Sequence, residues 1–284
     1  MPNWVRNNII AREPETLKKL LLDENGNVDF NKVIPMPQDL QITSGSMSYK
    51  VQHKTWFSEF TAEEIKKQQP ITDEFEKLYN DTMTQQEFAS LVVTNKPLFE
   101  KIRKFLGLKL RGQYAQRKDC IKDYIETFAK GFFNLKRYGE RDWYEWSINN
   151  WGCKWNASES RVDTKFDGTM VISFDTPWSP PQGVLEEIAK HTPIRVCWSD
   201  EGCSPAYIED YYLDEDDNLT NSIVLDNTEY LGEYAWDYGQ IHEWNSEKEE
   251  MEFNEEKTNE LDKKRAEYDK LMSQDTFNKD FQEV

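Results

Sequence analysis

The sequence lacks the segments that carry a protein to a membrane or hold it there. No stretch approaches the roughly 18 consecutive apolar residues that cross a bilayer. Residues 1–15 also lack the apolar core of a secretory signal peptide. We therefore expect a cytoplasmic protein without a membrane partner.

Cysteine is scarce, and its spacing does not fit the common cysteine sites. The four cysteines, Cys120, Cys153, Cys197 and Cys203, include no CxxC pair, so the sequence indicates neither a disulfide framework nor a paired zinc site. His191 with Cys197 and Cys203 could form a metal or nucleophile group, but three residues at unpaired spacings are more typical of packing and loop positions. We expect reduced thiols and no metal.

The motifs of the common enzyme classes are missing as well. There is no P-loop, GxGxxG, GxSxG or HExxH. The segment that begins at Asp214 superficially resembles a calcium loop, with Asp216 and Asn218 at the third and fifth positions. Leu219 and Leu225 occupy the places of the required Gly and bidentate Glu, which excludes an EF-hand and favours a solvated turn. We expect no enzymatic activity and no cofactor.

Positive charge is absent between Arg195 and Lys248, a stretch that holds fourteen acids and nine Tyr and Trp residues. Disordered acidic tails are poor in aromatics, so the pattern predicts a folded, negatively charged surface. Such a surface repels nucleic acid and attracts basic patches on other proteins. The candidate partner-binding residues are Glu209, Asp210, Tyr211, Asp214, Glu215, Asp216, Asp217, Glu229, Glu233 and Asp237.

The net charge of −18 is unevenly distributed. Residues 1–140 contain 22 Lys/Arg and 19 Asp/Glu, whereas residues 141–284 contain 13 and 34. Within the first part, residues 96–137 carry twelve Lys/Arg against four acids. This basic block could bind nucleic acid, lie against the acidic half of its own chain or of a second copy, or be a solvated face. For nucleic acid the candidates are Lys101, Arg103, Lys104, Lys109, Arg111, Arg117 and Lys118.

Hydrophobic periodicity predicts an α+β protein with a helical insertion. Strands are expected at residues 4–11, 154–163, 169–175, 194–198, 206–213 and 222–225, and core helices at 15–22 and 182–191. Without the insertion the order is βα, ββα, β, which is the split βαβ arrangement of a ferredoxin-like (βαββαβ) sandwich. This core comprises residues 1–37 and 140–240. The acidic segment 241–284 is expected to be a separate, peripheral charged helix, on a weak apolar stripe of Met251, Leu261, Tyr268 and Met272.

Residues 38–139 are predicted to form that insertion. Thr61 and Thr84 each precede a Glu by three residues and begin capping boxes. A compact helix is expected at 97–106, and Ile121, Tyr124, Ile125, Phe128 and Phe132 form a helical stripe. After the insertion, Trp143, Trp146, Trp151, Trp155 and Trp178 could form a stacking platform for a flat ligand, although packing between sheet and helices is the simpler interpretation.

Five segments in this order resemble the YubB-like ferredoxin-domain family of phage and plasmid proteins. They are Met1-Pro2-Asn3-Trp4 with Asn7, residues 29–37 (DFNKVIPMP), 150–156 (NWGCKWN), 174–181 (FDTPWSPP) and 199–202 (SDEG). The resemblance covers residues 1–37 and roughly 140–240 and implies a ferredoxin-like fold and a mobile-element origin, but no catalytic residue. Val5 stands where the family usually has Cys, which argues against a thiol function there.

Two functions are compared. The first is an inhibitor or adaptor in the host-cell cytoplasm that presents carboxylates where a nucleic-acid-handling host protein expects phosphates. The phage and plasmid setting implied by the resemblance makes restriction enzymes and CRISPR effectors natural targets. The second is a nucleic-acid-binding module that uses the basic block, against which the net charge of −18 counts. A third hypothesis is an enzyme with an unrecognised active site, and an acidic protein whose charge only keeps it dispersed is the simplest alternative to all three.

Overall fold

The computed structural model describes residues 2–43, 73–82, 84–105 and 118–281. The chain divides into two compact units: unit 1 comprises Met1–Pro35 and Ser147–Val284, and unit 2 comprises Met36–Trp146. Within the described ranges, none of the helices combines the length and the apolar composition needed to cross a membrane.

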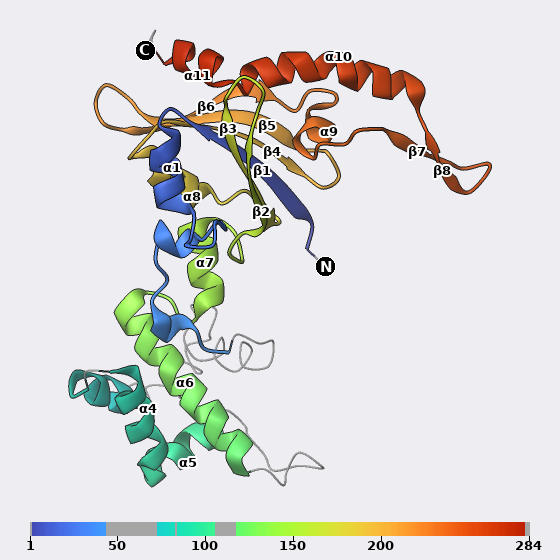
Figure 1. Ribbon diagram of the computed structural model, residues 1–284. Helices are drawn as coiled ribbons and strands as arrows, with labels where there is room; N and C mark the ends of the chain where they lie inside the picture. Colours follow the sequence, from blue (N-terminus) through green and yellow to red (C-terminus); the bar gives the residue numbers. More distant parts are fainter. Residues whose placement is uncertain (1, 44–72, 83, 106–117, 282–284) are drawn as a thin grey trace. The chain divides into compact units, whose positions relative to one another are not determined.

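Unit 1 contains a six-stranded antiparallel sheet in the order β2-β3-β1-β4-β5-β6 (Figure 1). With the helices α1 (Pro14–Leu21) and α8 (Gln182–Ala189) as connections, the first four strands form the split βαβ arrangement. The predicted α+β, ferredoxin-like class is confirmed, and β5 and β6 extend the sheet on one side. The strands are β1 Trp4–Ala11, β2 Ser158–Thr164, β3 Met170–Pro177, β4 Ile194–Asp200, β5 Ala206–Leu213 and β6 Leu219–Asp226.

Strand alternation explains how the sheet is covered on its first face. On β1, Val5, Asn7 and Ile9 point to the same face, and β3 is buried along its whole length. Pro14 begins α1, where its missing N–H costs nothing, and Leu17 of α1 and Val184 of α8 are fully buried. These two helices supply the apolar cover that the alternating strand residues require.

The second face is covered by segments that follow the sheet in sequence. These are α9 (Leu231–Ala235), α10 (Glu255–Leu271) and α11 (Gln274–Asp280). Leu261, Tyr268 and Phe277 are buried in one cluster with Ile10 and Cys197 of the sheet. The expectation that residues 241–284 form a peripheral helix is therefore wrong, because the second face carries apolar side chains that these helices cover.

The same C-terminal segment also forms a small separate sheet. β7 (His242–Asn245) and β8 (Glu250–Phe253) pair as an antiparallel hairpin, which projects from the rest of unit 1 (Figure 1). Met251, which sequence reasoning placed on the helical stripe, lies on β8 and is 56% exposed. Two short 3₁₀ helices are also present, Phe30–Lys32 in unit 1 and Gln38–Leu40 in unit 2.

Unit 2 is helical where it is described. Residues 73–80 are helical and are followed by α4 (Gln85–Thr94), α5 (Lys96–Phe105) and α6 (Lys118–Tyr138). Thr84 caps α4 by accepting a hydrogen bond from the Glu87 amide, as predicted, and Phe128 and Phe132 of the predicted stripe are buried. The capping box at Thr61 lies outside the described residues. α7 (Trp143–Trp151) begins in unit 2 and ends in unit 1.

Candidate partner-binding surface

The ten acidic and aromatic candidates do not form one continuous surface. β5 and β6 pair from Leu213 with Leu219 at one end to Tyr207 with Asp226 at the other. Asp214–Asp217 therefore lie at the first end, whereas Glu229 follows the second end. Eight strand residues span on the order of 25 Å. Sequence proximity made these groups appear contiguous, and the hairpin geometry separates them.

The turn at residues 214–217 is a solvated acidic loop. The Asp214 carboxylate accepts hydrogen bonds from the amides of Asn218 (2.8 Å) and Asp216 (3.0 Å). The Asn218 amide is the main reason that the pKa of Asp214 is lowered from its ordinary value. Glu215, Asp216 and Asp217 are exposed. Across the described residues, no three His, Cys, Asp or Glu side chains are grouped so that they could hold a metal ion.

Asp210 is a buried structural group, which corrects its place among the surface candidates. Its carboxylate accepts two hydrogen bonds from the guanidinium of Arg195, at 2.7 and 2.8 Å. Arg195 is 1% and Asp210 5% exposed. The same guanidinium donates to the Leu271 carbonyl and to Asp280 of α11, each at 2.8 Å. Asp210 therefore holds Arg195, which joins the sheet to the C-terminal helices, and it is not available to a partner.

Glu209 and Tyr211 lie on the opposite face of β5, because neighbouring strand residues alternate. The half-buried Glu209 carboxylate accepts hydrogen bonds from Nε1 of Trp198 (2.8 Å) and from the hydroxyl of Tyr211 (3.0 Å). Tyr211 is 2% exposed, and burial raises the pKa of its hydroxyl. Tyr211 is thus a packing residue, a second correction, while Glu209 is held by internal donors.

Acids do gather around α9, where three candidates remain near the surface. Glu229 and Asp237 are exposed and Glu233 is half-buried. With Glu201 and Glu243 we define them as the α9 acidic cluster. Two cations of α10 contact the cluster: Lys257 pairs with Glu243 at 2.6 Å and Arg265 pairs with Asp237 at 3.4 Å. The pKa of Lys257 is raised, first by its hydrogen bond to Glu243 (2.6 Å) and then by the charges of Glu243, Glu229 and Glu233. The five carboxylates of the cluster thus outnumber these two cations, which leaves the local field negative.

The position of α9 is fixed by a close approach to the turn between β4 and β5. A Cβ atom at Gly232 would lie 2.5 Å from Cα of Cys203, so only glycine permits this contact. Burial is the main cause that raises the pKa of the Cys203 thiol to about 12, and the charges of Glu233 and Asp200 add to it. The acidic cluster therefore rests on a tightly packed support.

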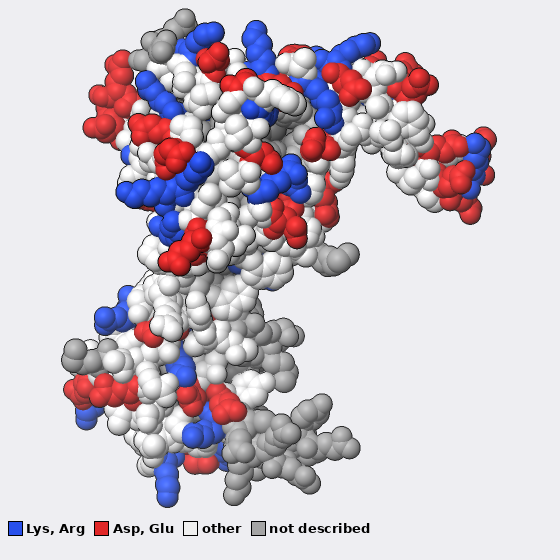
Figure 2. All heavy atoms as spheres, in the orientation of Figure 1, with Lys and Arg blue, Asp and Glu red and all other residues white. Residues whose placement is uncertain are grey.

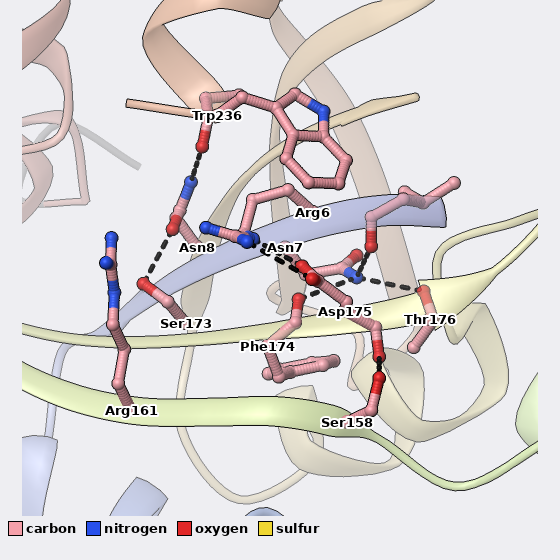
Figure 3. A network of polar contacts seen from close by, with 12 residues as sticks. Arg6, Asn7, Asn8, Ser158, Arg161, Ser173, Phe174, Asp175, Thr176 and Trp236 are labelled. Atoms are coloured by element: carbon pink, nitrogen blue, oxygen red, sulfur yellow. Dashed lines mark hydrogen bonds and ion pairs between the residues drawn. The ribbon is translucent and has the colours of Figure 1, made fainter. Parts of the chain in front are cut away.

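A polar network beneath α9 connects it to β1 and β3 (Figure 3). Arg6 forms an ion pair with Asp175, and its guanidinium lies 4.7 Å from the centre of the Trp236 ring. The indole Nε1 of Trp236 donates to the Asp200 carbonyl at 2.9 Å. Asn8 donates to the Ala235 carbonyl, also at 2.9 Å. These contacts hold the end of α9 against the second face of the sheet.

Next to this network lies a pocket of about 220 Å³. Three cations line it, and each is paired: Lys165 with Asp269 at 2.6 Å, Arg161 with Asp163 at 3.0 Å, and Arg265 with Asp237 at 3.4 Å. The lining charges therefore balance, and the pocket does not select a charged ligand.

The five Trp candidates divide between packing and surface. Trp146 and Trp151 are 6% and 4% exposed, and Nε1 of Trp151 donates to the Ile34 carbonyl at 2.9 Å. Trp155 and Trp178 are 38% and 51% exposed, with ring centres 5.7 Å apart. The ammonium of Lys154 lies 4.5 Å from the first ring and 5.1 Å from the second. A cation of the same chain thus already contacts the exposed pair. Trp143 begins α7.

The basic candidates in the described part of unit 2 are partly neutralised. Lys101 forms an ion pair with Glu74, and Arg103 with Glu100 at 2.7 Å. Lys104 is exposed on α5. Lys109, Arg111 and Arg117 lie outside the described residues, and Lys118 begins α6 without a described side chain.

The cysteine candidates are packing residues where they are described. Cys153, Cys197 and Cys203 are free thiols, and the first two are buried. Burial raises the pKa of both Cys153 and Cys197 to about 12, which disfavours a thiolate at neutral pH. His191 lies on the surface just after α8.

One family model agrees with the ferredoxin-like fold. Residues 150–269 match the family model described as the ferredoxin-like domain in Api92-like protein. Among solved structures, the chain is similar to the crystal structure of a protein api92 from Yersinia pseudotuberculosis. The sequence identity is 11% and the TM-score 0.33, and the alignment covers 80% of this chain and 100% of that chain. No curated protein matches the chain.

Proposed function

We propose that this chain, in which residues 150–269 match a ferredoxin-like domain, is an interaction protein that binds a basic protein through the α9 acidic cluster. The observation that carries the proposal is the excess of carboxylates around α9, where Lys257 and Arg265 pair with only two of the five acids and Glu229 is exposed. A surface with this excess of carboxylates attracts a basic partner and speeds its association.

The geometry supports this cluster over the other acidic candidates. Asp210 and Tyr211 are buried, and Asp214–Asp217 lie at the far end of β5 and β6. Glu229, Glu233 and Asp237, in contrast, surround a helix whose position is fixed by Gly232 and by the Trp236 contacts. Carboxylates on a fixed support lose little conformational freedom on binding, which favours affinity.

The partner class that fits this surface is a protein with a nucleic-acid-binding site, because such sites are rich in Lys and Arg that bind phosphates. Carboxylates at those positions would compete with nucleic acid. The resemblance to phage and plasmid proteins supports host-defence proteins of the restriction or CRISPR type as targets, in the cytoplasm of the host cell. The chain would then act as an inhibitor.

The test is competition between the chain and DNA for purified restriction and CRISPR effector nucleases. We expect the chain to displace a labelled DNA duplex from at least one of them, and the displacement to weaken as salt rises. Glu229→Lys with Glu233→Lys should reduce the affinity by about tenfold or more. Glu24→Lys with Asp81→Lys changes the charge equally at two exposed acids outside the cluster and should have little effect.

Two results would count against the proposal. One is equal loss of affinity in both charge-reversed variants, which would indicate a response to net charge alone. The other is displacement that does not depend on salt. Direct binding of DNA by the chain itself, retained in the Glu229→Lys, Glu233→Lys variant, would favour the alternative function of the basic block.

A further inference from the structure

The β7–β8 hairpin has one apolar and one polar face. His242 pairs with Phe253, and Trp244 pairs with Met251. Because alternate strand residues point to opposite sides, these four side chains share one face. The other face carries the pairs Glu243 with Glu252 and Asn245 with Glu250. The hairpin is thus amphipathic although only four residues of each strand are paired.

The apolar face is open to solvent. Trp244, Met251 and Phe253 are 61%, 56% and 49% exposed, and the rings of His242 and Phe253 lie 5.9 Å apart. Single exposed apolar residues are common, but adjacent ones on one face indicate a contact surface. Trp and Met are also enriched in the centres of protein interfaces.

The polar face is satisfied within the chain. Glu243 accepts hydrogen bonds from Asn254 at 2.7 Å and from Lys257 at 2.6 Å. Asn245 donates to Glu252 at 2.7 Å, and Lys248 forms an ion pair with the same carboxylate. The polar side chains therefore stabilise the hairpin itself and leave the apolar face as the side that remains to be covered.

The base of the hairpin is anchored to α10. The amide of Asn254 donates to the Ile241 carbonyl at 2.8 Å, and the Ile241 amide donates to the hydroxyl of Thr258 at 3.0 Å. Ile241 and Thr258 are 9% and 8% exposed. A two-stranded hairpin alone is marginally stable in water, so these contacts keep its apolar face in one orientation.

The charge around the apolar face indicates what covers it. Residues 243–256 contain seven acids and one lysine, and Figure 2 shows acidic side chains gathered on the projecting hairpin. In a symmetric pair of copies these acids would face each other, and an anionic membrane would repel them. A groove bordered by Lys and Arg would instead complement them.

We propose that the hairpin inserts Trp244, Met251 and Phe253 into an apolar groove that is bordered by Lys and Arg on a partner protein. The identity of the partner as a basic protein rests on the proposed function. The apolar contact is a separate property of this hairpin. Apolar anchors within a charged rim are the usual arrangement of an interface centre and its surroundings.

The test uses three synthetic twelve-residue peptides, in which Lys alternates with Leu, Lys alternates with Ser, or Glu alternates with Leu. We expect the full chain to bind the Leu-Lys peptide at least tenfold more tightly than the other two. Trp244→Ser with Met251→Ser should remove this preference while the circular dichroism spectrum stays unchanged. Phe166→Ser removes a fully exposed aromatic residue elsewhere on unit 1 and should bind like the wild type.

The remaining outcomes overturn the proposal. They are equal binding of the Leu-Lys and Ser-Lys peptides, binding of neither, or wild-type affinity in the Trp244→Ser, Met251→Ser variant. A concentration-dependent dimer in sedimentation that this variant abolishes would assign the face to a second copy. Binding to phosphatidylcholine vesicles would assign it to lipid. If the peptide test fails but Glu229→Lys with Glu233→Lys still weakens nuclease binding, the proposed function stands and only the hairpin proposal is rejected. If the peptide test succeeds but this variant binds nucleases like the wild type, only the proposed function is rejected.

Discussion

Replacing Asp210 by Ala tests the finding that this acid serves stability rather than partner binding. The substitution leaves the buried guanidinium of Arg195 without its two hydrogen bonds to Asp210, at 2.7 and 2.8 Å. Breaking a buried ion pair by removing one partner costs about 3–5 kcal/mol. Asp280 is 46% exposed and still contacts the guanidinium, so we expect the lower end, about 3 kcal/mol.

The assay is thermal unfolding followed by circular dichroism. For a unit of 150–250 residues, each kcal/mol shifts Tm by about 2–4 °C, so Asp210→Ala should lower Tm by about 6–12 °C. Arg195→Met with Asp210→Leu replaces both charges by apolar groups and should restore most of the loss. The affinity of the folded protein for its partner should not change. A Tm within about 2 °C of wild type, or a double variant as unstable as the single one, would refute this reasoning.

Three further predictions address α9, the hairpin and the thiols. Gly232→Ala should cost about 1–3 kcal/mol in urea unfolding, because the added Cβ overlaps backbone atoms of the β4–β5 turn. Gly239→Ala, with open space around it, should be neutral. Hydrogen bonds from Lys257 and then Asn254 lower the pKa of Glu243. The ionised Glu243 therefore stabilises the hairpin fully above the ordinary carboxyl pKa. This stabilisation is lost as the pH falls through the lowered pKa. The indole N–H NMR signal of Trp244 should shift in that acid range, and Glu243→Gln should reduce the transition to the part that comes from Glu252, whose pKa the hydrogen bond from Lys248 also lowers. Finally, Cys197, fully buried with its pKa raised to about 12, should react with a thiol reagent at pH 8 only as fast as the protein unfolds, and reaction at the rate of a free thiol would contradict the packing.

Much of unit 1 could be predicted because its sequence patterns are local and strong. The strand expected at residues 206–213 has those bounds in the structure, and β1 pairs with β3 and β4 as the ferredoxin-like order requires. The capping box at Thr84 marked the start of α4. In each of these cases the apolar period or the cap chemistry lies within a few residues, so tertiary contacts need not be known.

The candidate surface was less predictable because charge is not a periodic signal. The acidic run predicts one surface from Glu209 to Asp217, but strand alternation turns Asp210 to the second face and Glu209 to the first. A count of period two along the strand expected at residues 206–213 would have shown this. The ion pair with Arg195 depends on a strand register that the sequence does not specify.

The β7–β8 hairpin was missed although it has a signal. His242 and Trp244, and then Met251 and Phe253, alternate with acids on each side of a polar turn, which is the period of a hairpin. The high acid content favoured a charged helix instead. The burial of Leu261 and Tyr268 is likewise not predicted by the sequence. The apolar stripe on α10 is narrow, and the apolar face that these residues cover belongs to the sheet.

The position of β1 in the sheet has a consequence for synthesis on the ribosome. Trp4 pairs with Pro177 of β3, and Val5 pairs with Asp200 of β4. Val5 therefore lacks its β4 partner until synthesis has reached residue 200. At 5–20 residues per second this delay is on the order of 10–40 s. Residues 36–146 are synthesised in that interval, so the described helices α4, α5 and α6 can fold first. Ile10 stays uncovered longer, since Phe277 completes its cluster, and we expect chaperones that bind exposed strands to associate with the nascent chain.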